Sequence, residues 1–380
     1  MTTLRKTWHS LTFVSLSVTL VLFTATGSVA QAEPSRWFTE WSVPTSASEP
    51  LHVLSVTDDT IYFTERQSGK LGRLNPSDNS ITEWTVGGFP HFLILGRNGI
   101  LYADQAGRIG KFNPGANQVT FWPIPNGIPL HLAQVGNRLY FTDQGLGGRI
   151  GRLNLSNGKL RQWAIPTGDF PNGIDTDMSG RYIAFLGVTK LGILDTATGT
   201  FRQWPQPGLA TVGNGHVNFL GRYVFFGSNT PGGPISRLNT ATNTIRSWIL
   251  PTSSGIGDIG IEPDTDHGVI LDFVENDGNN IGHLNTANDG VDSIVAPLVA
   301  TVTPVDTITL PYPIMVPKVS TTVTPLRTEV IGVRTGPFVE WAIPTAASFP
   351  GGLDELPDGG LIFTERVGNK IGLMSGGSEE

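Results

Sequence analysis

The chain has 380 residues, with 25 Lys and Arg against 32 Asp and Glu, and a formal net charge of −7. The basic residues form no cluster, which argues against a nucleic-acid partner. Cysteine is absent, which excludes thiol chemistry and cysteine-ligated metals. An exported protein without disulfides is typical of bacteria, provided that its core is large enough to need no cross-links.

The N-terminal segment predicts an export signal. Residues 1–32 contain two basic residues, an apolar stretch at 11–23 and small residues ending at Ala32. The apolar stretch is short for a membrane span, which needs about 20 residues. We therefore expect a cleaved signal peptide, a secreted or extracytoplasmic protein, and no membrane association after cleavage.

A four-strand pattern repeats along the rest of the chain. Its first copy, residues 49–86, has four short apolar runs separated by Asp, Gly, Ser and Asn, which is the pattern of an antiparallel meander. The fourth run of each copy contains a Trp, expected to pack between blades, and consecutive copies up to Trp248 are 38 to 44 residues apart. Such repeats indicate a β-propeller, because one four-stranded sheet cannot bury both of its faces. The Trp residues are Trp41, Trp84, Trp122, Trp163, Trp204, Trp248 and Trp341.

The order of the strands predicts how the ring closes. An outer strand at 38–44 precedes any inner strand, and the chain ends on a third strand at 370–374. The N-terminal strand should therefore complete the last blade and remove the exposed edges of an open array. We predict an all-β fold, a seven-bladed β-propeller of four-stranded antiparallel blades over residues 33–374, with a flexible tail at 375–380.

The sixth blade departs from the pattern. Its second strand is expected at Gly268–Asp272, but its Trp-bearing strand does not begin until Phe338. The interval of about 286–337 is an insertion rich in Thr, Val and Pro. We expect an extended excursion, a small β-flap or a disordered spacer. A lid or a partner-binding segment is the functional alternative to a plain loop.

Chemistry is expected at one rim of the central channel, because the start of the first strand of a hairpin lies beside the end of the second. Polar residues that open the inner strands are His52, His91, His131, Asn172, either Asn214 or His216, and Asp258. Carboxylates that close the second strands are Glu65, Asp104, Asp143, Asp272 and Glu365. Converging carboxylates favour a cation such as Mg²⁺ or Ca²⁺, and a nearby His could act as a general base. The alternative is that these groups bond the backbone at strand ends and turns.

Blade 1 carries the densest cluster. Glu49, His52 and Glu65 are expected to meet at one strand pair. Arg66 and Arg366 each follow a closing Glu directly, and they are expected to pair with carboxylates or with an anionic group of a substrate.

The repeats resemble those of the streptogramin B lyase (virginiamycin B lyase) family. Members repeat Pro-His-Gly-Ile, Leu-Trp-Phe-Thr-Glu, Ile-Gly-Arg-Ile and Ile-Thr-Glu-Trp/Tyr-Pro-Ile-Pro, and the resemblance covers nearly the whole mature chain except the insertion. Matching stretches here include Pro90-His91, Tyr62-Phe63-Thr64-Glu65, Tyr140-Phe141-Thr142-Asp143, Phe363-Thr364-Glu365, Ile150-Gly151-Arg152-Leu153 and Ile81-Thr82-Glu83-Trp84.

The resemblance implies an Mg²⁺-dependent elimination that linearises a cyclic depsipeptide at its ester bond. On the matching positions, Glu49 and Glu65 would hold the metal, His52 would take the proton, and His91 is a second candidate base. Residues left to contact the substrate are Arg66, Asp104, His131, Asp143, Asp272 and Glu365. The chain departs from the family pattern where Leu51 separates Pro50 from His52, where Phe89 replaces a Glu, and where blade 7 opens with Gly351.

Three functions stay open at this point. The first is the metal-dependent lyase. The second is a non-catalytic, monomeric propeller that binds a small molecule, a peptide, a polymer or a surface ligand at the channel mouth. The third is a lactonase-type hydrolase with Ca²⁺ in the channel, for which only Asn172 and Asn214 offer amides. Glu49 and Glu65 within reach of one ion would favour catalysis, and a Glu49 that points elsewhere would favour binding.

Overall fold

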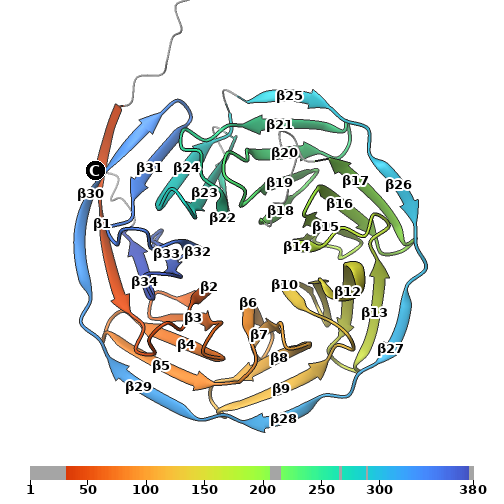
Figure 1. The fold of residues 1–380 in the computed structure, drawn as a ribbon, viewed down its shortest axis with the longest axis horizontal. Helices are drawn as coiled ribbons and strands as arrows, with labels where there is room; N and C mark the ends of the chain where they lie inside the picture. Colours follow the sequence, from red (N-terminus) through yellow and green to blue (C-terminus); the bar gives the residue numbers. More distant parts are fainter. Residues whose placement is uncertain (1–30, 206–214, 265–267, 288–289, 376–380) are drawn as a thin grey trace, which may run out of the picture.

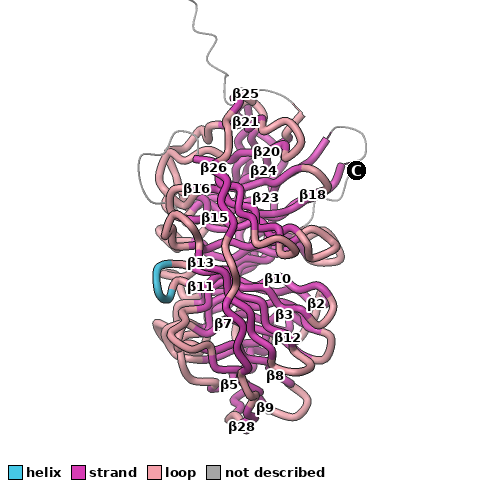
Figure 2. Tube along the Cα trace, turned by 90° about the vertical axis from the view of Figure 1, so that its right-hand side faces the viewer, coloured by secondary structure: helices cyan, strands magenta, loops and turns pink. Residues whose placement is uncertain are grey.

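A computed structural model describes residues 31–205, 215–264, 268–287 and 290–375. In it, short antiparallel strands form a ring around a central channel (Figure 1). Seen edge-on, the ring is flat, and the helical element visible on one side is the short 3₁₀ turn η1 (Gly145–Gly147) (Figure 2). Within the described ranges, no helix is long and apolar enough to cross a membrane. The predicted export signal up to residue 30, Asn214 and residues 376–380 lie outside them.

Five sheets have five strands each. One contains β2 (Pro50–Thr57), β3 (Thr60–Glu65), β4 (Lys70–Asn75), β5 (Ser80–Thr85) and β29 (Lys318–Thr322). The next contains β6 (Pro90–Gly96), β7 (Gly99–Asp104), β8 (Arg108–Asn113), β9 (Gln118–Pro123) and β28 (Tyr312–Met315). The third contains β10 (Pro129–Val135), β11 (Arg138–Asp143), β12 (Arg149–Asn154), β13 (Lys159–Ala164) and β27 (Val305–Ile308). The fourth contains β14 (Pro171–Thr176), β15 (Tyr182–Gly187), β16 (Lys190–Asp195), β17 (Thr200–Pro205) and β26 (Leu298–Thr301). The fifth contains β18 (Val217–Leu220), β19 (Tyr223–Gly227), β20 (Ile235–Asn239), β21 (Thr244–Trp248) and β25 (Val291–Ile294).

The sixth sheet has nine strands and contains the closure of the ring. In spatial order they are β22 (Ile256–Asp264), β23 (Gly268–Glu275), β24 (Asn280–Asn285), β31 (Phe338–Ala342), β30 (Leu326–Thr335), β1 (Gln31–Ser42), β34 (Lys370–Met374), β33 (Leu361–Glu365) and β32 (Pro350–Glu355). Two four-stranded units are thus joined through β30. Strand β1 pairs antiparallel with β34, with Phe38 opposite Met374. This is the pairing of chain ends that the strand order predicts.

The seven Trp residues of the repeat are all buried, and each belongs to an apolar cluster of the core. Trp84 shows how they act: its ring centroid lies 4.9 Å from that of Phe112 in the neighbouring sheet. Large aromatic side chains contribute much of the buried area where sheets meet. The predicted packing between units is confirmed for this Trp.

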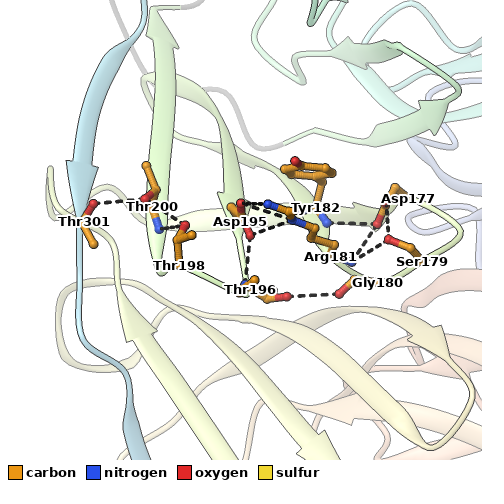
Figure 3. A network of polar contacts seen from close by, with 11 residues as sticks. Asp177, Ser179, Gly180, Arg181, Tyr182, Asp195, Thr196, Thr198, Thr200 and Thr301 are labelled. Atoms are coloured by element: carbon orange, nitrogen blue, oxygen red, sulfur yellow. Dashed lines mark hydrogen bonds and ion pairs between the residues drawn. The ribbon is translucent and has the colours of Figure 1, made fainter.

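The segment between β24 and β31 forms a belt, defined here as strands β25 to β30. These strands pair in turn with β21, β17, β13, β9, β5 and β1. The belt therefore passes the sheets in the reverse of their chain order and then returns to β31 (Figure 1). Where β26 lies along β17, the hydroxyl of Thr301 is 3.1 Å from that of Thr200 (Figure 3). Of the structures expected for the insertion, the belt is an extended excursion.

The belt corrects one expectation about the blades. The Trp-bearing strands were expected at the outer edges of the sheets, but each has a further neighbour outside it. Strand β1, for example, lies between β34 and β30. The belt strands satisfy backbone groups that would otherwise be left unpaired at the sheet edges.

The second strand of the sixth repeat is longer than expected. Strand β23 extends to Glu275, which lies opposite Ile256, so Glu275 and not Asp272 closes the strand. Asp272 lies in mid-strand opposite Gly260. The sequence signal is Phe273, which lies opposite Gly282 as Phe63 lies opposite Gly72 in the first repeat. Strands β22 and β23 are longer than β2 and β3 of the first repeat, so the spacing of the sequence did not show this register.

Candidate functional site

The inner strands place two layers of residues around the channel. The first layer follows the strand-opening position: Leu51, His91, Leu130, Asn172, Gly215, Gly257 and Gly351. The second layer is one residue further along: His52, Phe92, His131, Gly173, His216, Asp258 and Gly352. Their register is fixed because the next residue of each strand, such as Val53, pairs with an aromatic residue of the neighbouring strand.

Two cavities share the channel. One, the mouth pocket, has about 260 Å³ and is lined by the polar residues Arg66, His91, Asn172, Asn276 and Arg366, among others. The other, the opposite pocket, has about 340 Å³ and a more apolar lining. Both are lined by His52, Phe92, His216 and Asp258. We call these four residues the waist, because they border both pockets.

Contacts between aromatic rings and one close contact between an imidazole and a carboxylate hold the waist together. The ring centroid of Phe92 lies 3.7 Å from that of His52 and 4.4 Å from that of His131. Asp258 Oδ1 lies 2.7 Å from His216 Nδ1. Burial opposes the charge of Asp258, but its contact with His216 and a backbone hydrogen bond from Leu353 help to lower the pKa of this carboxyl below its ordinary value. Asp258 is therefore a buried carboxylate at neutral pH.

The imidazoles of His52, His91 and His131 are neutral. Burial lowers the pKa of His52 and of His91 to about 3, and it lowers the pKa of His131 well below its ordinary value. Nδ1 of His91 lies 3.2 Å from the carbonyl oxygen of Leu130, which orients its ring. Nδ1 of His52 and of His131 makes no hydrogen bond within the described part of the chain.

Glu49 fixes two guanidinium groups at the rim of the mouth pocket. Its carboxylate accepts a hydrogen bond from Arg66 Nε at 2.8 Å and another from the terminal nitrogen of Arg366 at 2.6 Å. Burial would raise the pKa of Glu49, but the two guanidiniums outweigh it and lower this pKa. Arg66 and Arg366 lie 300 residues apart in the chain and belong to units that adjoin only because the ring is closed.

The two carboxylates expected to hold Mg²⁺ or Ca²⁺ do not converge. Both oxygens of Glu49 are bonded to guanidinium groups, whereas Glu65 is fully buried beside Glu83. Among the residues that the structure describes, no metal-type cluster of three or more His, Asp or Glu includes either one. A carboxylate already neutralised by two cations is a poor ligand for a further cation, so these residues do not fit the ion that the family resemblance implies.

The remaining closing carboxylates bond their own blades. Asp104 accepts hydrogen bonds from the backbone nitrogen of Phe89 at 2.8 Å and from Arg108 at 2.6 Å. Asp143 accepts one from the backbone nitrogen of Ile128 at 2.8 Å. Their roles at these turns are structural. Asp272 lines the opposite pocket and lies 2.9 Å from His283 Nδ1.

Three Glu side chains, two of them fully buried, lie beside neighbouring carboxyl groups. Burial and a neighbouring carboxyl raise the pKa of Glu65, Glu340 and Glu365 to about 8, the neighbours being Glu83, Glu275 and Glu40. The folded protein therefore holds protons that the unfolded chain, with carboxyl pKa values near 4.5, has already released. The resulting stabilisation is complete below about pH 4.5 and is lost as the pH rises towards 8.

We predict that the unfolding temperature falls as the pH is raised from 5 to 8. The double variant Glu65→Gln, Glu365→Gln should flatten this fall, because an amide needs no proton to be neutral. Thermal unfolding followed by circular dichroism across this pH range measures the effect. Glu329→Gln, at an exposed position of β30, is the control and should leave the slope unchanged. An equally steep fall in the double variant would contradict the assignment.

The comparisons with known proteins point to one kind of structure. No protein-family model matches the chain, and no curated protein matches its sequence. A solved streptogramin B lyase structure aligns with 90% of this chain and 98% of its own, at 20% identity and a TM-score of 0.67. The chain has the β-propeller fold of streptogramin B lyase. At this identity the similarity shows the fold and not the activity.

Two further structures agree with this. Virginiamycin B lyase from Staphylococcus aureus covers 89% of this chain and 99% of its own at 18% identity, with a TM-score of 0.65. A catalytically inactive form of that lyase was solved with quinupristin and gives a TM-score of 0.66. The extracellular domain of a hybrid two-component system from B. thetaiotaomicron gives 0.59 at 12% identity, covering 89% of this chain and 39% of that one.

Within this lyase-like propeller, the expected site residues separate into two groups. His52, His91, His131 and Arg66 line the mouth pocket together, whereas Glu65, Asp104, Asp143 and Glu365 are buried inside the blades. Asn172 also lines the mouth pocket. The expectations missed Phe92, Asn229 and Asn276. Phe92 could have been found, because it stands two residues after Pro90 as His52 stands two residues after Pro50.

Proposed function

We propose that the protein is an exported, monomeric, seven-bladed propeller that binds a peptide or depsipeptide ligand in its mouth pocket. The blade count is supported by the five five-stranded sheets and by the two four-stranded units of the nine-stranded sheet. Export is supported by the apolar N-terminal segment of the sequence.

One observation carries the binding proposal. Five buried polar atoms that line the mouth pocket make no hydrogen bond within the described part of the chain: His52 Nδ1, His131 Nδ1, Asn172 Oδ1, Asn276 Oδ1 and Arg366 Nε. A buried polar group without a partner costs about 1–3 kcal/mol. A peptide supplies both the N–H donors that amide oxygens need and the carbonyl acceptors that a guanidinium needs.

The test is the affinity for quinupristin, measured by isothermal titration calorimetry with the mature protein. We expect one site per chain and a loss of at least about tenfold in Arg366→Gln, which is roughly the effect of one charge-assisted hydrogen bond. Arg181→Gln is the matched control, because Arg181 also pairs with a carboxylate, Asp195 at 2.9 Å, but lies outside the pocket (Figure 3). Absence of saturable binding, or equal effects of the two variants, would refute the proposal.

A second candidate function is elimination at the ester of such a ligand. His91 follows Pro90, as in the family repeat, and lines the pocket with its ring oriented by Leu130. In this reaction a neutral imidazole removes the proton next to a carbonyl, the C–O bond breaks, and the ester oxygen leaves as a carboxylate. The guanidinium of Arg66 or Arg366 would stabilise the negative charge that develops on the carbonyl oxygen. The low pKa of His91 weakens it as a base, so binding is the function favoured here.

Mass spectrometry of quinupristin after incubation separates the outcomes. Elimination opens the ring without a change of mass, whereas hydrolysis adds one water. Because Glu49 and Glu65 do not converge, we expect any turnover to survive EDTA and to be lost in His91→Ala.

A further inference from the structure

We propose that the waist binds a divalent transition-metal ion through His52, His216 and Asp258. Among the described residues, these three form the group of His, Asp or Glu side chains whose ligand atoms all lie within 4.8 Å of one another. Asp258 Oδ1 lies 2.7 Å from His216 Nδ1, and Asp258 Oδ2 lies 3.6 Å from His52 Nε2. This site is separate from the Glu49 and Glu65 positions and does not depend on the peptide-binding proposal.

The spacing suits a small ion after minor rotation of the side chains. Bonds of about 2.0–2.2 Å from zinc to nitrogen or oxygen place neighbouring ligand atoms about 3.3–3.6 Å apart in a tetrahedral site. The distance from Asp258 to His216 is shorter than this range, and the distance from Asp258 to His52 lies at its upper end. Two imidazoles and one carboxylate select ions such as Zn²⁺, Co²⁺, Ni²⁺ or Fe²⁺, whereas Mg²⁺ and Ca²⁺ favour oxygen ligands.

Hydrogen bonds from its surroundings orient Asp258. In known metal sites, similar hydrogen bonds to the ligands orient them toward the ion. The backbone nitrogen of Ile259 donates to Oδ1 at 2.7 Å, and that of Leu353 donates to Oδ2 at 3.0 Å. Leu353 belongs to β32 of the neighbouring unit. The carboxylate is therefore held in place by backbone groups from two units, and it is 2% exposed.

His131 supplies a second, independent observation. Its side chain is 6% exposed, its Nδ1 makes no hydrogen bond within the described part of the chain, and its ring centroid lies 4.9 Å from that of His216. An unpartnered imidazole beside the cluster is a candidate fourth ligand or a hydrogen-bond partner of a metal-bound water. Because the waist borders both pockets, an ion bound there would lie at the boundary of the mouth pocket.

The test uses the mature protein without a histidine tag, first treated with a chelator and then titrated with Co²⁺. We expect one equivalent to bind with visible absorption bands, Zn²⁺ to displace it, and Mg²⁺ in large excess not to displace it. His216→Ala and His52→Gln should each weaken binding at least 100-fold. Circular dichroism establishes that each variant is folded. If only one of the two variants folds, its affinity for Co²⁺ alone is sufficient to test the proposal.

His283→Ala is the matched control. His283 Nδ1 lies 2.9 Å from Asp272 Oδ1, so this variant also removes a His–Asp pair of the same sheet, but one outside the waist. We expect it to bind Co²⁺ as the parent protein does. The proposal is overturned if the parent protein takes up no Co²⁺ at equimolar concentration, or if the folded waist variants bind as tightly as the His283→Ala control.

Discussion

Replacing residues 286–337 by a tight turn is expected to give a propeller that folds but self-associates, with an unfolding temperature lower by about 10 °C or more. The backbone nitrogen of Asn285 lies 3.1 Å from the carbonyl oxygen of Pro337, so a short turn can join β24 to β31 directly. The shortened chain would leave the outer edges of β5, β9, β13, β17 and β21 unpaired. Unpaired edges are templates for pairing with another chain.

Size-exclusion chromatography and scanning calorimetry measure this effect. Ile308→Ser is the control, because it changes an exposed side chain of the belt, 75% accessible, while every strand pairing stays in place. It should remain monomeric with an unfolding temperature close to that of the parent. A belt-free variant that is monodisperse and equally stable would show that the belt does not protect the edges.

The second large effect is expected from Gly151→Val. A Cβ at Gly151 would lie 2.1 Å from Cζ of Phe141, a fully buried ring on the facing strand. A side chain forced into a packed core costs about 1–3 kcal/mol, occasionally more, and a branched residue directly over a ring should lie at the upper end. Urea unfolding gives the free energy of unfolding.

Gly115→Val is the matched control for this substitution. Gly115 is exposed, and the nearest atom to a Cβ there would be Asn113 Oδ1 at 3.5 Å. We expect a change of less than about 0.5 kcal/mol, as for ordinary surface positions. If both variants lost equal stability, the aromatic contact would not explain the repeated glycine.

This contact explains why the repeat could be predicted from sequence. The recurring Gly lies under an aromatic ring of the facing strand in most units, as at Gly72 and Phe63. The distance in sequence between the aromatic residue and the Gly therefore indicates how the two strands pair. The closure by β1 was predictable too, because the chain begins with a fourth strand and ends with a third. The belt was not, since its strands have no repeat and each pairs with a distant edge that sequence spacing does not encode.

The candidate site was predictable only in part. His52, His91 and His131 could be placed at the channel, because strand-opening positions recur in register. The prediction that Glu49 and Glu65 converge was wrong, because the proximity of two strand ends does not determine where their side chains point. Arg366, 317 residues away in sequence, attracts Glu49 instead, and only the closed ring brings these two residues together.

The belt also imposes an order in time. Its strands can pair only with sheets that already exist, and β31 to β34 follow the belt in the chain. During synthesis the first five sheets can form before these strands have emerged, whereas the nine-stranded sheet can be completed only once residues 338–374 are available. A chain that stops short of this segment can pair β1 with β30, but it leaves β1 without β34 and β24 without β31. Incomplete products should therefore be easy for chaperones and proteases to distinguish from finished molecules.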